Sequence, residues 1–443
     1  MTLKSLYSPY VWMLIIASAC SKTPPVETGT KGGGIIFGHN LKIAVVSDIH
    51  YMDPSLLKNN ASAGTAFQDY LAADPKLIEF SDPIFRTVIS QLKSEKPDIL
   101  LIPGDLTKDG ELVSHKTMVG LLRQLSDAHI KVFVVPGNHD INNPEARTYN
   151  GDVATPTPSI SAADFSSLYA DYGYRNALAR DPGSLSYVCQ PYPNLWILGL
   201  DDCEYYDNKD IAIVAGKIKP ETMKWALDRL QEAKRRHITV LGMMHHNMIE
   251  HYVGQTQLDP GYVTDNWEAE ADAFMKAGMS VIFTGHYHAN DITRRVTGDK
   301  ELYDIETGSL VTAPIPYRIL TMNRNEFDIE TRHVTSIHAS LPGGISFPDY
   351  SNQFFVQHLD GYFGYFLSSP PYSLPPDLVS FGAPLFRNAL MAHFAGDEII
   401  NPTDAANDQV LADISPEIGG ALSSLWTDIN TTDNNVHIVF TAP

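Results

Sequence analysis

The side chains best suited to chemistry in this sequence lie in five short segments, each of which follows a run of aliphatic and β-branched residues. In chain order the segments are Asp48-Ile49-His50, Gly104-Asp105, Gly137-Asn138-His139-Asp140, His245-His246 and Gly285-His286-Tyr287-His288. Such segments lie in loops after the carboxyl ends of strands, where neighbouring loops converge. Carboxylate, imidazole and amide donors without a thiolate suit a pair of Mn²⁺, Fe, Co²⁺ or Zn²⁺ ions. The chemistry that this set predicts is metal-assisted hydrolysis.

Asp105 suits a position between two metals. Two cations ~3.5 to 4 Å apart repel each other strongly, so they need an anionic carboxylate and a bridging hydroxide between them. Glycines precede the ligands at Gly104, Gly137 and Gly285. We expect them to allow sharp turns and a close approach of the backbone to the metals.

The Gly137 to Asp140 and Gly285 to His288 segments resemble the ligand motifs of calcineurin-like metallophosphoesterases. The resemblance covers about residues 41–333, and all five segments occur in the order of that family. It implies a dinuclear centre in which one metal takes Asp48, His50 and His288, the other takes Asn138, His245 and His286, and Asp105 bridges both. A metal-bridging hydroxide would then attack phosphorus, with no side-chain nucleophile.

Two positions of this predicted site leave alternatives open. His245 is favoured over His246 as the ligand because a side chain one residue later points to the opposite side of an extended chain. His246 is then an outer group or simply a packed residue. The resemblance implies that His139 faces the substrate, where it protonates the leaving oxygen or stabilises the phosphoryl charge. Either Asp140 or Asp109 could hold its ring.

The residues after Asp105 narrow the choice among the subclasses of this superfamily that the chain could resemble. Protein Ser/Thr phosphatases of this superfamily carry an arginine shortly after the bridging aspartate, and purple acid phosphatases carry a tyrosine ligand three residues after it. Here that position is Lys108 and the arginine is absent. The Gly-Asp-Leu-Thr run at 104–107 and Leu200-Asp201-Asp202 look most like class III cyclic-nucleotide phosphodiesterases. This likeness predicts that the substrate is a small phosphodiester, and cyclic nucleotides are the first candidates.

Three other functions stay open for the same motifs. Two are enzymatic, namely a phosphomonoesterase and a phospholipid or glycerophosphodiester hydrolase. The third is a metal-bearing surface binding protein without turnover. Retention of Asp48, Asp105 and His139 argues against this last one, because decayed sites commonly lose the bridging carboxylate or the proton-handling histidine.

The elements that must position these segments alternate between strand and helix. Strands are predicted at 42–46, 99–102, 132–135, 238–243 and 280–283, and helices at 82–94, 113–129, 162–178, 220–236 and 267–276. Three more strands, at 301–305, 317–323 and 327–333, follow one another without helices. The pattern predicts an α/β domain over residues 35–339, in which a two-sheet metallophosphoesterase sandwich is flanked by helices.

Residues 340–443 have a different composition, rich in aromatics and proline. Phe355, Phe363 and Phe366 recur at helical spacing, and Pro370-Pro371 ends that helix. We expect a small helical accessory domain in which these aromatics form a core or a docking face. Resemblance to exported phosphodiesterases with helical extensions implies that it leans over the site.

The first residues read as a targeting signal. Lys4 and an apolar run at 11–16 precede Ala17-Ser18-Ala19-Cys20, which resembles a bacterial lipobox, and the run is too short to span a bilayer. Residues 21–34 are rich in Thr, Pro and Gly and read as a flexible tether. The prediction is an exported lipoprotein of the cell envelope, anchored in the membrane through an acylated Cys20. An ordinary cleaved signal peptide is the alternative.

Charge and cysteine content set further limits. The 443 residues carry a formal net charge of -20, which repels nucleic-acid backbones, so we expect no nucleic-acid polymer as a partner. A small phosphate ester is still compatible with this charge as a substrate, because two bound cations reverse the sign of the local charge at the site.

Cys189 and Cys203 flank a predicted hairpin, and we expect two reduced, mostly buried thiols.

Overall fold

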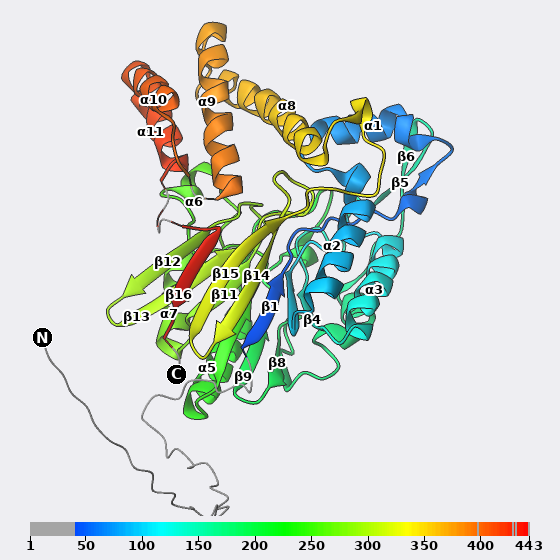
Figure 1. Cartoon of the computed structure of the whole chain (residues 1–443), viewed down its shortest axis with the longest axis vertical. Helices are drawn as coiled ribbons and strands as arrows, with labels where there is room; N and C mark the ends of the chain where they lie inside the picture. The colour runs from blue at the N-terminus through cyan, green and yellow to red at the C-terminus, as the bar shows by residue number, and fades with distance from the viewer. Residues whose placement is uncertain (1–39, 397, 428, 430–431, 442–443) are drawn as a thin grey trace, which may run out of the picture. The chain divides into compact units, whose positions relative to one another are not determined.

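The computed structural model describes residues 40–396, 398–427, 429 and 432–441 (Figure 1). The predicted export signal and tether at residues 1–34, including Cys20, lie outside these residues. Within the described ranges, no helix combines the length and the apolar character that crossing a bilayer requires.

The first sheet has six strands in the order β16-β15-β14-β1-β3-β4. Its strands are β1 (Leu41–Val45), β3 (Ile99–Pro103), β4 (Lys131–Val135), β14 (Pro316–Asn323), β15 (Glu326–His333) and β16 (Asn435–Val439). β1, β3 and β4 run parallel, so their carboxyl ends share one edge of the sheet.

The second sheet has seven strands in the order β12-β13-β11-β10-β9-β8-β7. Its strands are β7 (Ala179–Arg180), β8 (Tyr187–Tyr192), β9 (Leu195–Gly199), β10 (Thr239–Met243), β11 (Val281–Thr284), β12 (Ile292–Thr297) and β13 (Lys300–Glu306). β9, β10, β11 and β13 are parallel. A small third sheet joins β2 (Leu57–Lys58), β5 (Arg147–Asn150) and β6 (Val153–Pro156).

The two large sheets share one apolar core, because β1, β3, β9, β10 and β11 are largely apolar and almost fully buried. Val45 and Leu100 of the first sheet belong to the same buried cluster as Leu241 and Phe283 of the second. Flanking helices cover the outer faces with apolar residues at helical spacing. These are α2 (Ser81–Glu95), α3 (Leu112–Asp127), α5 (Pro220–Arg235) and α7 (Trp267–Ala277). The predicted two-sheet sandwich with helices outside is confirmed.

The helix predicted at 162–178 is wrong in its second half. α4 spans only Ala162–Leu168, and a 3-10 turn at Ala170–Tyr172 follows it. The chain then turns at Gly173, whose φ of 131° is open to glycine but strained for other residues. The ring of Tyr187 packs directly against this glycine and leaves no room for a side chain. The apolar spacing alone would continue this helix beyond Leu168, but tertiary packing ends it there.

Four helices follow the sheets along the chain, and Figure 1 shows them grouped beyond one end of the strands. They are α8 (Phe347–Ser368), α9 (Pro376–Ala395), α10 (Pro402–Ile414) and α11 (Pro416–Leu425). Each carries a proline in its first turn, where the ring costs no hydrogen bond. Phe363 of α8 packs on Phe386 of α9 with ring centroids 5.4 Å apart. The predicted C-terminal helical region is confirmed, and the expected aromatic stripe forms its core.

The last described strand differs from the expectation of a purely helical segment after residue 340. β16 pairs antiparallel with β15 over five residue pairs, from Glu326↔Val439 to Glu330↔Asn435. Alternating Val436, Ile438 and Phe440 supply the short apolar pattern of an edge strand. The chain therefore returns from the helices to the first sheet.

Cys189 and Cys203 are free and buried, which confirms the prediction of two reduced thiols. Cys189 Sγ lies 2.9 Å from the carbonyl oxygen of Gly173, whereas Cys203 Sγ lies 3.5 Å from that of Pro136. Burial raises the pKa of the Cys189 thiol to about 12. This thiol therefore stays protonated and acts as a small apolar residue.

Candidate metal centre and active site

All five segments emerge from carboxyl ends of parallel strands and meet between the two sheets. Asp48 and His50 follow β1, Asp105 follows β3, and Asn138 and His139 follow β4, whereas His245 follows β10 and His286 and His288 follow β11. Five of these residues adopt positive φ angles in the left-handed region, namely Asp48 at 49°, His50 at 42°, Asp105 at 45°, His286 at 73° and His288 at 70°. Such strain in non-glycine residues concentrates at functional sites.

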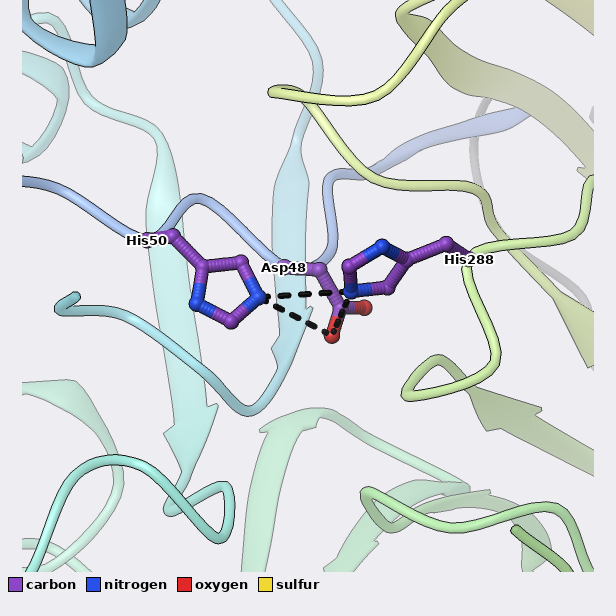
Figure 2. A group of neighbouring side chains, drawn as sticks. All are labelled: Asp48, His50 and His288. Carbon is purple, nitrogen blue, oxygen red and sulfur yellow. Dashed lines mark hydrogen bonds and ion pairs between the residues drawn. The ribbon is translucent and has the colours of Figure 1, made fainter. Parts of the chain in front are cut away.

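The first group consists of Asp48, His50 and His288, whose side chains point toward one another in Figure 2. The Nε2 atoms of His50 and His288 are 3.3 Å apart. Asp48 Oδ1 lies 3.4 Å from His288 Nε2 and 3.9 Å from His50 Nε2. Three donor atoms therefore face one common point.

The second group consists of Asp105, His245 and His286, with Asn138 beside them. His245 Nε2 lies 3.5 Å from Asp105 Oδ2 and 3.1 Å from Asn138 Oδ1. The same Asp105 Oδ2 also lies 3.5 Å from His50 Nε2 of the first group. Asp105 is thus placed between the two groups.

The two groups fit a pair of divalent metal ions. Asp48 Oδ1 and His286 Nε2 are buried without a hydrogen-bond partner in the described structure. Burial lowers the pKa of His50 and of His286 well below the ordinary value, so both imidazoles are neutral. Burial alone would raise the pKa of Asp105, but His245, His139 and His50 hold it well below its usual range. The ionised Asp105 and the neutral His50 and His286 are in the protonation state that a bound metal requires. Burial lowers the pKa of His245, but Asp105 raises it to about 10, so a metal at Asp105 would have to displace the proton of that imidazole.

Outer contacts fix the orientation of these side chains. His245 Nδ1 lies 2.9 Å from the carbonyl oxygen of Pro103, and His288 Nδ1 lies 3.1 Å from Thr312 Oγ1. Asp48 Oδ2 accepts hydrogen bonds from Ser47 Oγ at 2.5 Å and from the backbone N–H of His286 at 3.0 Å. Each contact occupies one nitrogen or oxygen of a side chain, so the second nitrogen or oxygen can face the two ligand groups, as in metal centres generally.

The ring of His246 packs on that of His286 with centroids 4.1 Å apart, but both of its nitrogens have partners outside the two groups. Its Nδ1 lies 2.9 Å from Asp202 Oδ2, and its Nε2 lies 2.7 Å from the carbonyl oxygen of Val214. Asp202 also accepts the backbone N–H groups of His245 and His246, at 3.4 Å and 3.2 Å. The structure therefore places His245 beside Asp105 and makes His246 part of the support of that turn.

His139 lies at the edge of the two groups and is held by Asp109. Its Nδ1 is 3.0 Å from Asp109 Oδ1, and its backbone N–H donates to Asp105 Oδ1 at 2.9 Å. The other carboxylate considered for this role, Asp140, instead accepts backbone N–H groups of Leu106 at 3.1 Å and Gly137 at 2.9 Å. Asp140 thus shapes the loops that carry Asp105 and Asn138, and it does not touch the His139 ring.

Buried charges around His139 favour its imidazolium form. Burial lowers its pKa, but Asp105 and Asp109 outweigh burial and raise the pKa above the ordinary value of 6.5. Asp109 is itself ionised, since Lys108 and His139 lower its pKa despite its burial. Lys108 forms an ion pair with Asp109 in which both side chains are buried. A proton is therefore retained on His139, whose side chain is 22% exposed.

Two glycines permit the close approach of the loops. A side chain at Gly137 would collide with the carboxylate of Asp105, and one at Gly285 would collide with Ser47 and Asp48. The expected close approach at these positions is present, and it brings loops of both sheets together.

A cavity of about 700 Å³ opens over the site. Its floor includes His50, Asp105, Asn138, His139, His286 and His288. Its opposite wall consists of apolar and aromatic residues of α8 and α9, among them Phe355, Leu359, Tyr362, Phe363, Phe366, Phe386, Leu390 and Phe394. The accessory helices therefore supply one side of the cavity that holds the candidate ligands.

Lys76 is a site residue that the sequence analysis missed. It is the only lysine or arginine among the residues that line this cavity, and its Nζ lies 3.2 Å from Asp74 Oδ2. Burial lowers its pKa, but Asp74, Asp105 and Asp109 more than compensate, so it stays charged. Lys76 follows helix α1 (Thr65–Ala73) in a loop that no strand-end motif marks. Only the tertiary structure brings it to the site.

Comparison with known proteins shows the family to which these motifs belong. Residues 41–290 match the family model of calcineurin-like phosphoesterases. A probable cyclic nucleotide phosphodiesterase of Vesicomyosocius okutanii subsp. Calyptogena okutanii is 35% identical over 65 residues, which are 15% of this chain and 27% of that protein. One of Ruthia magnifica subsp. Calyptogena magnifica is 40% identical over 58 residues, which are 13% and 24% of the two chains. The chain thus spans about a quarter of the length of these curated relatives.

Two solved structures that resemble this chain have a lower sequence identity to it than these two relatives. A dimetal phosphatase from Danio rerio is 15% identical, with a TM-score of 0.47, over 67% of this chain and 96% of the other. A putative 5'-nucleotidase from Staphylococcus aureus, solved in complex with alpha-ketoglutarate, is 15% identical, with a TM-score of 0.39, over 74% and 59%.

The Asp109 contact predicts the titration of His139. In metal-free protein, we expect the His139 imidazole to titrate above pH 6.5, and we expect Asp109→Asn to lower that midpoint because a neutral amide no longer favours the imidazolium ion. NMR titration of the ring protons measures both values. Asp127→Asn, at the exposed end of α3, is the control that removes a distant carboxylate. A midpoint that is equal or higher in Asp109→Asn would contradict this account.

Proposed function

Because the chain belongs to the calcineurin-like phosphoesterase family, we propose that it hydrolyses small phosphodiesters, with cyclic nucleotides as the leading substrates. Family membership makes the chain a hydrolytic metallophosphoesterase, and this family uses a dinuclear metal centre. The observation that carries the diester proposal is the continuity of the cavity. Its floor holds the candidate metal ligands, and its far wall offers an apolar surface to a second substituent on the phosphate. A phosphomonoester with a small leaving group would leave that wall unused.

The proposed ligands follow the two groups. Asp48, His50 and His288 would hold one metal, Asn138, His245 and His286 would hold the other, and Asp105 would bridge both. When bound, the two metals supply a Lewis acid for the phosphoryl oxygens and lower the pKa of water. The side chains of the protein fix the position of this pair, since their outer nitrogens and oxygens are held by Pro103, Thr312 and Ser47.

His139 is the proposed proton donor. Hydrolysis forms a bond from phosphorus to the oxygen of water and breaks the bond from phosphorus to the leaving oxygen, which must gain a proton. His139 Nδ1 faces Asp109, so Nε2 is the nitrogen that donates. The raised pKa of His139 supports this role, because its proton is retained near neutral pH until the leaving group takes it.

Lys76 is proposed to attract and position the anionic substrate. Its ammonium group lies in the lining of the same cavity as His139 and Asp105. The net charge of the chain is -20, so a buried cation at the cavity gives the local attraction that the bulk charge does not. Asp74 holds this side chain in place without removing its charge.

A second candidate substrate class is favoured by the composition of the cavity wall. Phe363, Phe386 and Leu390 present apolar carbon rather than polar groups, and an acyl chain of a phospholipid would fit such a surface. A nucleobase would instead stack on the rings of Tyr362 or Phe366, which lie nearly parallel to each other with centroids 6.2 Å apart. The two classes share the same reaction at phosphorus.

Turnover and metal content test the proposed reaction. With Mn²⁺ added, we expect faster hydrolysis of bis(p-nitrophenyl) phosphate than of p-nitrophenyl phosphate, and hydrolysis of a cyclic nucleotide. Asp105→Asn should abolish turnover and weaken both metal sites. His139→Ala should retain its metal while turnover falls by ~10² to 10⁴. Preference for the monoester would refute the diester assignment, and no turnover of any ester would favour a binding protein.

The aromatic wall gives a second test, for which α8 offers a matched pair of tyrosines. Tyr362 is 52% exposed and lines the cavity, whereas Tyr365 is 74% exposed and does not. We expect Tyr362→Ala to raise KM about tenfold for its natural substrate class because a stacking or apolar contact is lost. Tyr365→Ala should leave KM unchanged. Comparison of a cyclic nucleotide, a lysophospholipid and glycerophosphocholine shows which class loses affinity, and an equal KM in both variants would exclude the wall from substrate binding.

Export and membrane tethering through Cys20 form a separate proposal, supported by the sequence of residues 1–34 alone. Expression of the full chain in a bacterial host followed by membrane fractionation tests it. We expect the chain in the membrane fraction and Cys20→Ser in the soluble fraction, because the acyl chain would be missing. A wild-type chain that stays in the cytosol would refute export.

A further inference from the structure

We propose that Asp291, His393 and Glu398 form an additional divalent-metal site, separate from the dinuclear centre, that joins α9 to the loop before β12. His393 lies in the last turn of α9, Glu398 follows that helix, and Asp291 directly precedes β12. One ligand atom of each residue lies within 4.8 Å of the others. His393 Nδ1 is 2.5 Å from Glu398 Oε1 and 3.8 Å from Asp291 Oδ2.

The first argument is an excess of buried negative charge. The side chains of Asp291, His393 and Glu398 are exposed by only 2%, 1% and 0%. Two more buried carboxylates, Asp304 and Glu306, lie around His251 next to this group. Among the described residues, no lysine or arginine forms an ion pair with any of the four carboxylates. Despite burial, these carboxylates raise the pKa of His251 and of His393, so both imidazoles offset part of the buried negative charge. A metal ion between the carboxylates would supply the same compensation in place of the His393 proton.

Arg318 is a buried arginine that binds main-chain oxygens of Glu306 and Asp291. Arg318 is fully buried, and its guanidinium donates to the backbone oxygens of Glu306, at 2.8 Å and 3.1 Å, and of Asp291, at 3.4 Å. It therefore satisfies main-chain groups at the end of β13 and before β12. Glu306 Oε1 accepts the backbone N–H of Ala289 at 3.1 Å, and Asp291 Oδ1 contacts His251 Nδ1.

The second argument is independent of charge and concerns hydrogen bonds. Four buried atoms of this cluster have no hydrogen-bond partner in the described structure, namely Asp291 Oδ2, Glu398 Oε2, Glu306 Oε2 and His393 Nε2. Buried polar atoms in native proteins are almost always paired. A cation bound between Asp291, His393 and Glu398 would satisfy the carboxylate oxygens that no donor reaches.

The donor types select the kind of metal. Two carboxylates and one imidazole suit Mn²⁺, Fe²⁺, Co²⁺ or Zn²⁺, and the absence of a thiolate argues against softer ions. His251 supports the site from behind, because its Nδ1 contacts Asp291 Oδ1 and its Nε2 lies 3.5 Å from Asp304 Oδ2. Asp304 in turn accepts the backbone N–H of Met248 at 2.7 Å. Such outer contacts orient metal ligands.

The position of this site gives it a structural role. Asp291 lies three residues after His288 along the chain, while Phe386, Leu390 and Phe394 on the helix of His393 line the substrate cavity. A metal held between Asp291 and His393 would fix α9 against the loop that carries the candidate ligands of the dinuclear centre. It would thereby set the distance between the cavity floor and its apolar wall.

Metal content of the full chain tests this site. We expect mass spectrometry of metal-saturated, dialysed protein to give one ion more per chain than the dinuclear centre holds. His393→Ala and the nearly isosteric Glu398→Gln should each lose one ion. His358→Ala is the matched control, since His358 also lies in the accessory helices and contacts the backbone of Phe354 and Leu71, far in sequence from this cluster. It should keep the full count.

Crystallography of the wild-type chain gives a readout that needs no variant. An anomalous difference peak between Asp291, His393 and Glu398 is expected at the absorption edge of the bound metal, in addition to peaks at the dinuclear centre. Two occupied ions at Asp105 with no peak at His393 would overturn the proposal. An unchanged metal count in both His393→Ala and Glu398→Gln would overturn it as well.

Discussion

One buried carboxylate, Asp105, must lie between imidazoles that belong to different sheets. It follows β3 of the first sheet, yet its Oδ2 lies 3.5 Å from His245 Nε2, which follows β10 of the second. That distance requires the carboxyl ends of both sets of parallel strands to meet at one place. It also requires loops without side chains at Gly137 and Gly285, and left-handed backbone conformations at Asp48 and Asp105. The apolar core shared by the sheets supplies the stability that this strained arrangement costs.

The same constraint separates two kinds of histidine by their surroundings. His50 and His286 lie where burial dominates, so their pKa values fall and they are neutral. His139 lies near two carboxylates, so its pKa rises despite burial, and Lys108 keeps Asp109 ionised behind it. Neutral imidazoles can bind a cation, whereas a charged one can give up a proton. One cluster of similar side chains therefore offers both functions because the neighbouring charges differ.

The sequence predicts what depends on local pattern. Apolar runs followed by Asp, Asn or His located the strand ends, and five ordered segments indicated a common site. It could not choose between Asp109 and Asp140 beside His139, because both lie close along the chain and only the loop geometry directs one of them to the ring. Lys76, the Asp291 and His393 pair, and β16 are joined to their partners by tertiary packing across long sequence separations. The early end of α4 likewise depends on a ring of Tyr187 that packs on Gly173.

The helices after the sheets add a function that the sandwich alone does not supply. The strand ends give the cavity a floor of charged and polar groups, which can act on any phosphate ester. Helices α8 and α9 give it a wall that distinguishes among the substituents attached to the phosphate. Selectivity then depends on how firmly the wall is held relative to the floor. Tyr287 lies between two candidate ligands and packs its ring 5.7 Å from that of Phe394, and His393 points to Asp291 in the adjoining loop. Floor and wall are therefore coupled through a short stretch of chain, so a change in either one alters the space available to the substrate.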